Sequence, residues 1–251
     1  MKKALLILTG LLATQAVNAA DTVKFSVAAE PYPPFATKQA DGSWKGFEID
    51  LIHKICEEAS LDCQIKEIAW DGIIPALVSD KIDVIFASMT VTDERSKKVL
   101  FTHPYYNTIP AFVGLAGQEF APTKDALKGK IIGVQTSTIA AFYAKEKFGK
   151  FATIRQYDTQ DAVNSDLMAG RLDYMIADDI PATEFFNANK AGLEYYGKVP
   201  YEPILGKGIA AAVRLDETAL EQKLSATIDK IVKSDYYDKL SMQYFGTNIA
   251  P

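Results

Sequence analysis

The chain has 251 residues, of which 48% are hydrophobic and 24% charged, and its formal net charge is −5. This composition is typical of a globular protein, and it excludes an intrinsically disordered chain because such chains have far fewer hydrophobic residues. The acidic balance and the lack of a basic tract argue against nucleic acid as a partner, since neutralising phosphates requires clustered Lys and Arg.

Residues 1–19 have the features of a secretory signal peptide. Lys2 and Lys3 give a basic start, an apolar run extends to Leu12, and small residues precede the end of the segment at Ala19. A membrane anchor would need about 18 to 20 uninterrupted apolar residues, and polar residues interrupt this run too early. We expect cleavage after Ala19 and export of the remaining chain. The mature chain then has 251 − 19 = 232 residues and, with both N-terminal lysines removed, a net charge of 25 − 32 = −7.

The first predicted strand of the mature chain covers Lys24–Ala28 and leads into a proline-rich loop. This loop runs from Glu30 to Phe35, and its three prolines restrict the backbone dihedrals. It presents a carboxylate and the ring of Tyr32 just after the strand. Apolar residues at helical spacing then predict a helix from Phe47 to Ala59.

The only two cysteines are Cys56 and Cys63. In an exported chain this even number favours one disulfide bond. The alternative is a metal site, because His53 lies one helical turn from Cys56, but two thiols and one imidazole leave a metal short of ligands. We therefore expect a disulfide, no metal and no cofactor.

An internal repeat is the most informative pattern in the chain. Residues 71–88 resemble residues 161–178 at an offset of 90, and the match includes Lys81-Ile82-Asp83 with Arg171-Leu172-Asp173. Any two helix–turn–strand units share generic features. The charged and apolar positions match together, however, which favours a true duplication.

Each copy predicts a helix of about ten residues followed by a buried strand. Asp71 and Asp161 are placed to cap the two helices. The strands are Val84–Ala87 and Tyr174–Ala177. A looser second repeat pairs the first strand with Lys130–Val134, which precedes another predicted helix.

Two repeated units of this kind predict an α/β protein of two lobes rather than one continuous sheet. The extended segment Pro104–Gly117 joins the halves, and a second extended segment, Tyr201–Arg214, follows the second copy. The helices predicted for Glu217–Lys233 and Asp235–Phe245 then return to the first lobe. Two crossover strands make a hinge, with a ligand cleft between the lobes.

These segments define the expected domains. Residues 20–109 and 207–251 form lobe 1, and residues 110–206 form lobe 2 including the hinge segments. Because strand ends of both lobes meet at the cleft, polar residues at those ends are candidates for ligand contacts.

The strand ends place Ser88-Met89-Thr90 on lobe 1 and Asp178 on lobe 2 at equivalent positions of the repeat. Arg95 and a helix start at Gln135–Thr138, with its free N–H groups, could hold a carboxylate. Asp178, with the oxygens of Ser88 and Thr90, could accept hydrogen bonds from an ammonium. Together these groups complement the zwitterion of an α-amino acid.

The remaining pocket is expected from the proline-rich loop and the first repeat. Tyr32 and Trp70 could enclose a flat or cationic group, and Glu30 could pair with its charge. The ligand-binding candidates are Glu30, Tyr32, Trp70, Ser88, Met89, Thr90, Arg95, Gln135, Ser137, Thr138 and Asp178.

Each candidate also has a plainer interpretation. Arg95 could be a solvated surface arginine, and the two aromatic residues could belong to the core, as we expect for Phe35. Ser137 or Thr138 could serve only as the cap of a helix that ends at Gly149. For the acidic pair before Pro181 we expect Asp178 to bind ligand and Asp179 to cap the next helix.

At these residues the chain resembles the periplasmic solute-binding proteins of polar amino-acid ABC transporters, solute-binding protein family 3. It is most similar to the lysine/arginine/ornithine, histidine, arginine and opine binders, over essentially the whole mature chain. The motifs that carry the resemblance are residues 32–35 (YPPF), 46–51 (GFEIDL), 70–77 (WDGIIPAL), 88–95 (SMTVTDER), 133–138 (GVQTST) and 170–173 (GRLD).

The resemblance implies a type II periplasmic binding protein fold that closes like a Venus flytrap on its ligand. It also implies roles for the candidates. Arg95 and the backbone of Thr90 and Thr138 would hold the carboxylate, and Asp178 with Ser88 and Thr90 would hold the ammonium. The aromatic pair Tyr32 and Trp70 would flank the side chain, with Glu30 near its far end. Cys56 and Cys63 lie where similar binders carry a disulfide.

Three positions depart from the family pattern. Ala29 stands where lysine-type binders have an Asp, Ala87 replaces a frequent serine, and Ile139 replaces a polar residue. These departures favour a guanidinium ligand. We expect arginine first, then ornithine, lysine, histidine or an arginine-derived opine.

The expected partners are an amino-acid ligand and the permease subunits of an ABC transporter, with a chemoreceptor or sensor as a further possible partner, and the protein is expected to be a monomer. The alternative function is a periplasmic enzyme like cyclohexadienyl dehydratase, to which the resemblance extends. Such an enzyme needs a general acid in the cleft, and Glu30 could take that role. The zwitterion clamp of Arg95 and Asp178 instead suits retention of an amino acid, so we expect a binding protein and no catalytic residues.

Overall fold

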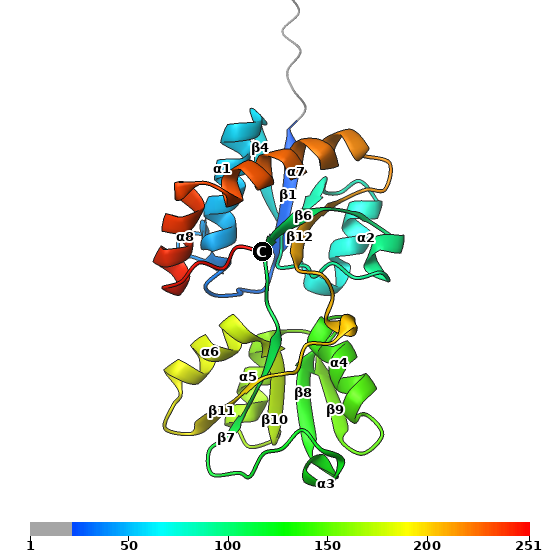
Figure 1. Ribbon diagram of the computed structural model, residues 1–251, viewed down its shortest axis with the longest axis vertical. Coiled ribbons are helices and arrows are strands. Elements are labelled where there is room, and N and C mark those ends of the chain that lie inside the picture. Colours follow the sequence, from blue (N-terminus) through cyan, green and yellow to red (C-terminus); the bar gives the residue numbers. More distant parts are fainter. Residues whose placement is uncertain (1–21) are drawn as a thin grey trace, which may run out of the picture.

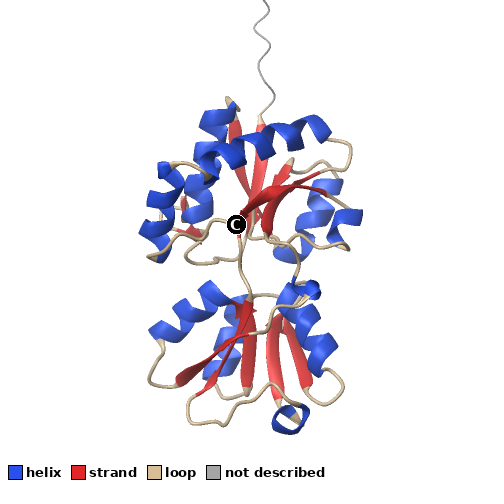
Figure 2. Cartoon of the chain, viewed as in Figure 1, coloured by secondary structure: helices blue, strands red, loops and turns tan. Residues whose placement is uncertain are grey.

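The computed structural model describes residues 22–251, and the predicted signal peptide lies outside them. Two α/β lobes lie one above the other, each with a twisted sheet covered by helices (Figure 1 and Figure 2). Among the described helices, none combines the length and the apolar character needed to cross a membrane. The two-lobed fold expected from the sequence is confirmed.

The sheet of lobe 1 has the strand order β4-β1-β5-β12-β6. Strand β1 pairs in parallel with β4 and β5, whereas β12 is antiparallel to β5 and β6. Lobe 1 comprises β1 (Val23–Ala28), β2 (Thr37–Lys38), β3 (Trp44–Lys45), α1 (Phe47–Ala59), β4 (Cys63–Ile68), η1 (Trp70–Gly72), α2 (Ile73–Val78), β5 (Val84–Ile85), η2 (Arg95–Lys97), β6 (Leu100–Tyr106), β12 (Ile209–Val213), α7 (Thr218–Val232) and α8 (Asp235–Phe245).

The sheet of lobe 2 has the order β11-β7-β10-β8-β9. Strands β8, β9 and β10 run parallel, and β7 is antiparallel to β10 and β11. Lobe 2 comprises β7 (Pro110–Leu115), α3 (Lys124–Leu127), β8 (Ile131–Gln135), α4 (Ile139–Phe148), β9 (Thr153–Tyr157), α5 (Gln160–Met168), β10 (Tyr174–Asp178), α6 (Asp179–Ala188), β11 (Leu193–Lys198) and η3 (Pro203–Leu205).

Each sheet is buried on both faces. Since alternate side chains of a strand point to opposite sides, neighbouring residues pack into different clusters. Around β5, Val84 and Phe86 pack into the cluster under α1, α7 and α8, while Ile85 packs with α2 on the other face. In β10, Ile176 and Met175 divide in the same way between two clusters. The last residues of the parallel strands β1, β8 and β10 lie where the two lobes face each other, and they line the cavity between the lobes.

The chain crosses between the lobes twice, as the sequence predicts. It leaves lobe 1 between β6 and β7 and returns between β11 and β12 (Figure 1). The two crossings pass close together. A Cβ on Gly208, whose φ is +96°, would lie 2.6 Å from Oδ1 of Asn107 on the other crossing. The Asn107 side chain could move aside, but a φ of +96° is itself a conformation that residues with a side chain rarely adopt, so glycine is favoured at this position.

Helix starts are the part of the sequence-based prediction that was wrong. Asp161 does not cap α5, because the Thr159 hydroxyl two residues earlier accepts the N–H of Ala162. Asp71 lies inside η1, and α2 begins after Gly72 without a side-chain cap. With nine residues α5 agrees with the expected length of about ten, whereas α2 has only six.

Asp179 does not cap α6 either. It is the first residue of that helix, and Asp178 holds the N-cap position without a side-chain cap bond. The Asp179 carboxylate instead accepts a hydrogen bond from Tyr195 at 2.6 Å and pairs with Lys198 at 2.8 Å. By contrast, Thr138 caps α4 as expected, with its hydroxyl oxygen accepting the N–H of Ala141.

The expected disulfide is present and joins Cys56 on α1 to Cys63 on β4. It closes a loop of a few residues and ties the helix to the edge strand of lobe 1. Within residues 22–251, no three His, Cys, Asp or Glu side chains are grouped so that they could hold a metal ion.

Candidate ligand-binding site

A cavity lies between the two lobes at the ends of their strands. The centres of water molecules can occupy about 60 Å³ of this cavity, which is room for roughly four to six waters. Its lining comes from both lobes and includes nine of the eleven candidate residues. These nine are Glu30, Tyr32, Trp70, Ser88, Thr90, Arg95, Gln135, Thr138 and Asp178.

Arg95 brings a buried positive charge to the cavity. It is the first residue of η2 and only 8% exposed. Its Nη1 donates to the carbonyl of Thr90 and its Nη2 to the carbonyl of Ser137, both at 2.9 Å, so the guanidinium joins the two lobes. No carboxylate among the described residues forms an ion pair with it, and burial lowers the pKa of Arg95 to about 10. A buried charge without a partner is costly, so this site favours an anion.

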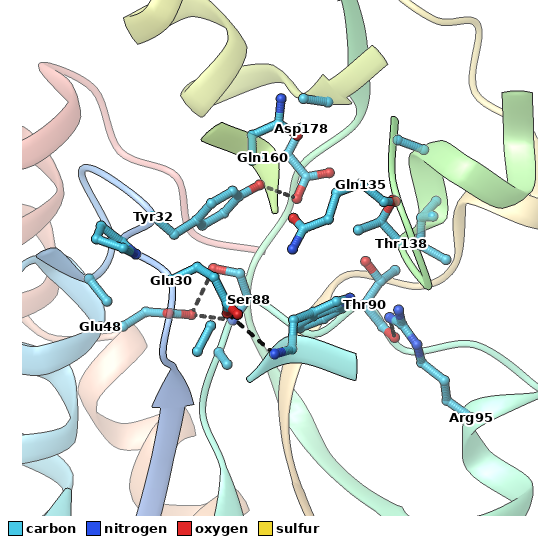
Figure 3. A pocket seen from close by; sticks show the side chains of 18 residues that line it. Glu30, Tyr32, Glu48, Ser88, Thr90, Arg95, Gln135, Thr138, Gln160 and Asp178 are labelled. Carbon is cyan, nitrogen blue, oxygen red and sulfur yellow. Dashed lines mark hydrogen bonds between the residues drawn. The ribbon is translucent and has the colours of Figure 1, made fainter. Parts of the chain in front are cut away.

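Asp178 brings the opposite charge from lobe 2. It ends β10, and its Oδ2 accepts a hydrogen bond from the Tyr32 hydroxyl of lobe 1 at 3.0 Å (Figure 3). No basic side chain within the described part of the chain forms an ion pair with it. Burial raises the pKa of Asp178 to about 6, because the charged form is poorly solvated there. An ammonium would supply the missing countercharge.

The helix α4 adds a second feature that favours an anion. Its N-cap Thr138 and its first residues Ile139 and Ala140 line the cavity. The first N–H groups of a helix have no partner within the helix, and the helix dipole is positive at this end. The N-terminus of α4 therefore contributes to the positive side of the site.

Glu30 and Trp70 lie together on the lobe 1 side. The Glu30 carboxylate accepts the backbone N–H of Trp70 at 3.3 Å. The Trp70 ring faces the Arg95 guanidinium at 5.5 Å in a cation–π arrangement. The Trp70 ring thus packs on the arginine, and Tyr32 stacks on Phe35 at 5.9 Å. Phe35 itself is 1% exposed, as expected for a core residue.

Two candidates do not line this cavity. Met89 is 1% exposed and packs in the core of lobe 1 next to α2. The Ser137 side chain is exposed, although its carbonyl binds Arg95. Both residues line a larger, mostly apolar groove of about 730 Å³ between α2 and α4.

Sequence reasoning missed two polar residues that line the cavity, Glu48 and Gln160. Glu48 lies within the GFEIDL motif but looks like an ordinary acidic residue in the first turn of a helix. Gln160 opens α5 and lies 90 residues after Trp70, so the repeat itself could have identified it. The pairs Ser88/Asp178 and Ala87/Ala177 have the same offset and also line the cavity.

Comparisons with known proteins agree with this architecture. Residues 25–247 match the bacterial extracellular solute-binding proteins, family 3. The L-arginine-binding protein of Pseudomonas aeruginosa is 37% identical over 222 residues, which cover 87% of this chain and 86% of that protein. The lysine/arginine/ornithine-binding periplasmic protein of Escherichia coli is 32% identical over 258 residues, 99% of each chain.

A solved structure gives the same result in three dimensions. An ancestral arginine-binding protein bound to arginine aligns with a TM-score of 0.81 and 31% identity, covering 90% of this chain and 98% of that one. These similar proteins are all named as amino-acid-binding proteins, and the family that this chain matches consists of solute-binding proteins. Its sequence match, its two-lobed fold and its interlobe cavity agree: the chain belongs to family 3 of the bacterial extracellular solute-binding proteins.

Proposed function

We propose that this chain captures a free basic amino acid between its lobes and delivers it to the permease of an ABC transporter. The observation that carries the proposal is the pair Arg95 and Asp178, a guanidinium and a carboxylate that line one cavity without countercharges from the described chain. An amino-acid zwitterion supplies both countercharges at once, because its ammonium and its carboxylate lie on the same carbon.

In this proposal each pole of the zwitterion has its own set of groups. Arg95, the backbone of Thr90 and Thr138, and the N-terminus of α4 hold the carboxylate. Asp178 holds the ammonium together with the oxygens of Ser88 and Thr90. The ligand bridges the lobes and so favours the closed state over the open one.

The charge of the cavity supports a cationic side chain. Among the described residues, the carboxyl groups of Glu30 and Asp178 line it against the guanidinium of Arg95, and Glu48, whose pKa burial raises to about 7, adds a third carboxyl group. A ligand with two positive groups and one negative group suits that balance better than a neutral amino acid. The names of the similar proteins, which include arginine and lysine/arginine/ornithine binders, support the same choice. We place arginine first, then ornithine, lysine, histidine or an arginine-derived opine.

Calorimetric titration of the purified protein with arginine, ornithine, lysine, histidine, glutamine and an arginine-derived opine tests the function. We expect arginine to bind with a dissociation constant of about 1 µM or below, or roughly −8 kcal/mol, and glutamine to bind more weakly. If none of these ligands produces heat and none raises the unfolding temperature, the proposed function is wrong.

Glu30→Gln is expected to weaken arginine about tenfold and to leave glutamine within about twofold. The change keeps the shape of the side chain and removes one charge, so only a cationic ligand loses an interaction with it, an effect of about 1.4 kcal/mol. Glu67→Gln on β4 is the matched control, because Glu67 makes a surface ion pair with Lys38 outside the cavity. Equal losses of affinity for arginine and glutamine in Glu30→Gln would show that Glu30 does not interact with the charge of the ligand side chain.

The cellular context completes the proposal. The signal peptide is cleaved after Ala19, and the protein works in the periplasm as a monomer. The lobes comprise residues 20–109 with 207–251, and residues 110–206. The closed form docks on the permease, and a chemoreceptor or sensor recognises the same closed form.

A further inference from the structure

Glu48 is a buried acidic residue that does not serve its own helix. It is the second residue of α1 and 1% exposed, and the start of α1 at Gly46 has no side-chain cap bond. Figure 3 shows its carboxylate turned toward Ser88, beside the cavity that it lines. Burying a carboxylate disfavours its charged form, and burial raises the pKa of Glu48 to about 7. Because burying this carboxylate is unfavourable, we expect Glu48 to have a specific role.

One oxygen of Glu48 fixes both the backbone and the side chain of Ser88. Its Oε1 accepts the Ser88 N–H at 2.7 Å and the Ser88 hydroxyl at 3.0 Å. The same oxygen also accepts the hydroxyl of Tyr105, which holds the carboxylate in place. Ser88 is in the left-handed region, with φ of 52°, where a residue other than glycine is strained. The two bonds from Ser88 compensate for that strain.

This arrangement decides what Ser88 can offer a ligand. A serine hydroxyl has a single proton and two lone pairs. Because the proton is donated to Glu48, only lone pairs are left for the cavity. Ser88 can therefore accept a hydrogen bond from an ammonium but cannot donate one to an oxygen of the ligand.

We propose that Glu48 is a positioning residue for the ligand's α-ammonium, acting by orienting Ser88 as an obligatory hydrogen-bond acceptor. The inference rests on the proposed function and deepens it, since it assigns the selection of an α-amino group to a residue beneath the site. Asp178 on lobe 2 attracts the ammonium by its charge. On lobe 1 the Ser88 hydroxyl oxygen, held in one orientation by Glu48, accepts a hydrogen bond from it.

Two uncharged variants of Glu48 distinguish the effect of its hydrogen-bond acceptor from the effect of its negative charge. Glu48→Gln keeps an oxygen that can accept the bonds of Ser88, whereas Glu48→Met has a similar length and no comparable acceptor. Each is titrated with arginine and with 5-guanidinopentanoic acid, which keeps the guanidinium, the chain and the carboxylate but lacks the α-amino group. The readout is the ratio of the two affinities, which a general loss of stability would not change.

Glu48→Met is expected to lower the preference for arginine about tenfold, as for the loss of one hydrogen bond to a charged group. Glu48→Gln is expected to recover most of the preference. Ser88→Ala should lower it as much as Glu48→Met, and the double variant Glu48→Met/Ser88→Ala should be no worse than Ser88→Ala alone. If Glu48→Met does not fold by circular dichroism, Glu48→Leu takes its place.

Three outcomes would overturn the inference. They are an unchanged preference in Glu48→Met, equal losses in Glu48→Met and Glu48→Gln, and additive losses in the double variant. Each leaves the proposed function intact as long as the unchanged protein binds arginine. Failure of the unchanged protein to bind arginine would instead overturn the proposed function.

Discussion

Asp178→Asn is expected to weaken arginine binding at least a hundredfold. In the proposed complex the ligand ammonium has Asp178 as its countercharge on lobe 2, and asparagine would leave it buried without one. Removing one partner of a buried ion pair costs about 3 to 5 kcal/mol, or roughly two to four powers of ten in affinity. Isothermal titration calorimetry measures the loss directly.

Asp179→Asn is the matched control for this variant. It makes the same chemical change one residue later, where the carboxylate pairs with Lys198 and Tyr195 and does not line the cavity. Its arginine affinity should stay within about threefold of that of the unchanged protein. An Asp178→Asn protein that binds arginine as well as the Asp179→Asn protein would refute the ammonium site.

The pH dependence of binding provides an independent check on Asp178. Burial raises the pKa of this carboxyl to about 6 in the empty cavity, so it takes up a proton as the pH falls through that value. An ammonium stabilises the charged form, which means that binding releases the proton. Affinity should therefore be highest above pH 7 and fall by up to about tenfold per pH unit below 6. Titrations in buffers of different ionisation enthalpy should detect the released proton at pH 6, and Asp178→Asn should reduce the release.

The fold could be predicted from the sequence because its signals are local and repeated. The apolar spacing of α1 and the short buried strands β5 and β10 depend on near neighbours in the chain. The repeat at an offset of 90 then places equivalent strand ends in the two lobes. Three cavity-lining pairs keep this offset: Trp70/Gln160, Ala87/Ala177 and Ser88/Asp178. The offset of the repeat is thus kept among the residues that line the cavity.

The helix starts could not be predicted from composition, because neighbouring polar residues compete for the same N–H groups. Thr159 takes the cap of α5 and leaves Asp161 in the first turn. Either residue type can cap a helix, and the choice depends on where the chain enters it.

The roles of Glu48 and Met89 depend on tertiary contacts. Glu48 meets Ser88 across 40 residues of sequence, and its bonds form only after α1 packs against the sheet. Met89 follows Ser88 directly but packs into the core beside α2 rather than at the cavity. Sequence position at a strand end therefore predicts that a segment reaches the cleft, but not which of its side chains turns into it.

The interlobe bonds also lie beyond sequence reasoning. The Tyr32 hydroxyl meets Asp178 across 146 residues, and the Arg95 guanidinium meets the Ser137 carbonyl across 42. Both need the two lobes to be close together. They show that the charged groups of the site have a second task, which is to hold the lobes together.

That second task sets the expected effect of changing Arg95. Arg95→Lys keeps the positive charge but replaces two donor nitrogens in a planar fork with a single ammonium nitrogen, which cannot occupy the positions of both Nη1 and Nη2 beside the carbonyls of Thr90 and Ser137. Arg95→Met removes the charge as well. We expect arginine affinity to fall about tenfold to a hundredfold in Arg95→Lys and at least a hundredfold in Arg95→Met, as for the loss of a buried charge pair.

The two Arg95 variants distinguish charge from geometry when titration is combined with small-angle X-ray scattering of the liganded protein. If the fork matters for closure, Arg95→Lys should leave a larger radius of gyration at saturating arginine than the unchanged protein has. Arg171→Lys on lobe 2 is the control, because Arg171 is exposed and pairs with Asp166 away from the cavity. It should change neither affinity nor compactness. Unchanged binding in Arg95→Met would mean that the ligand carboxylate is held elsewhere. Equal affinity and equal compactness in Arg95→Lys and the unchanged protein would mean that charge alone is sufficient, because the lysine ammonium has no fork with which to join the lobes.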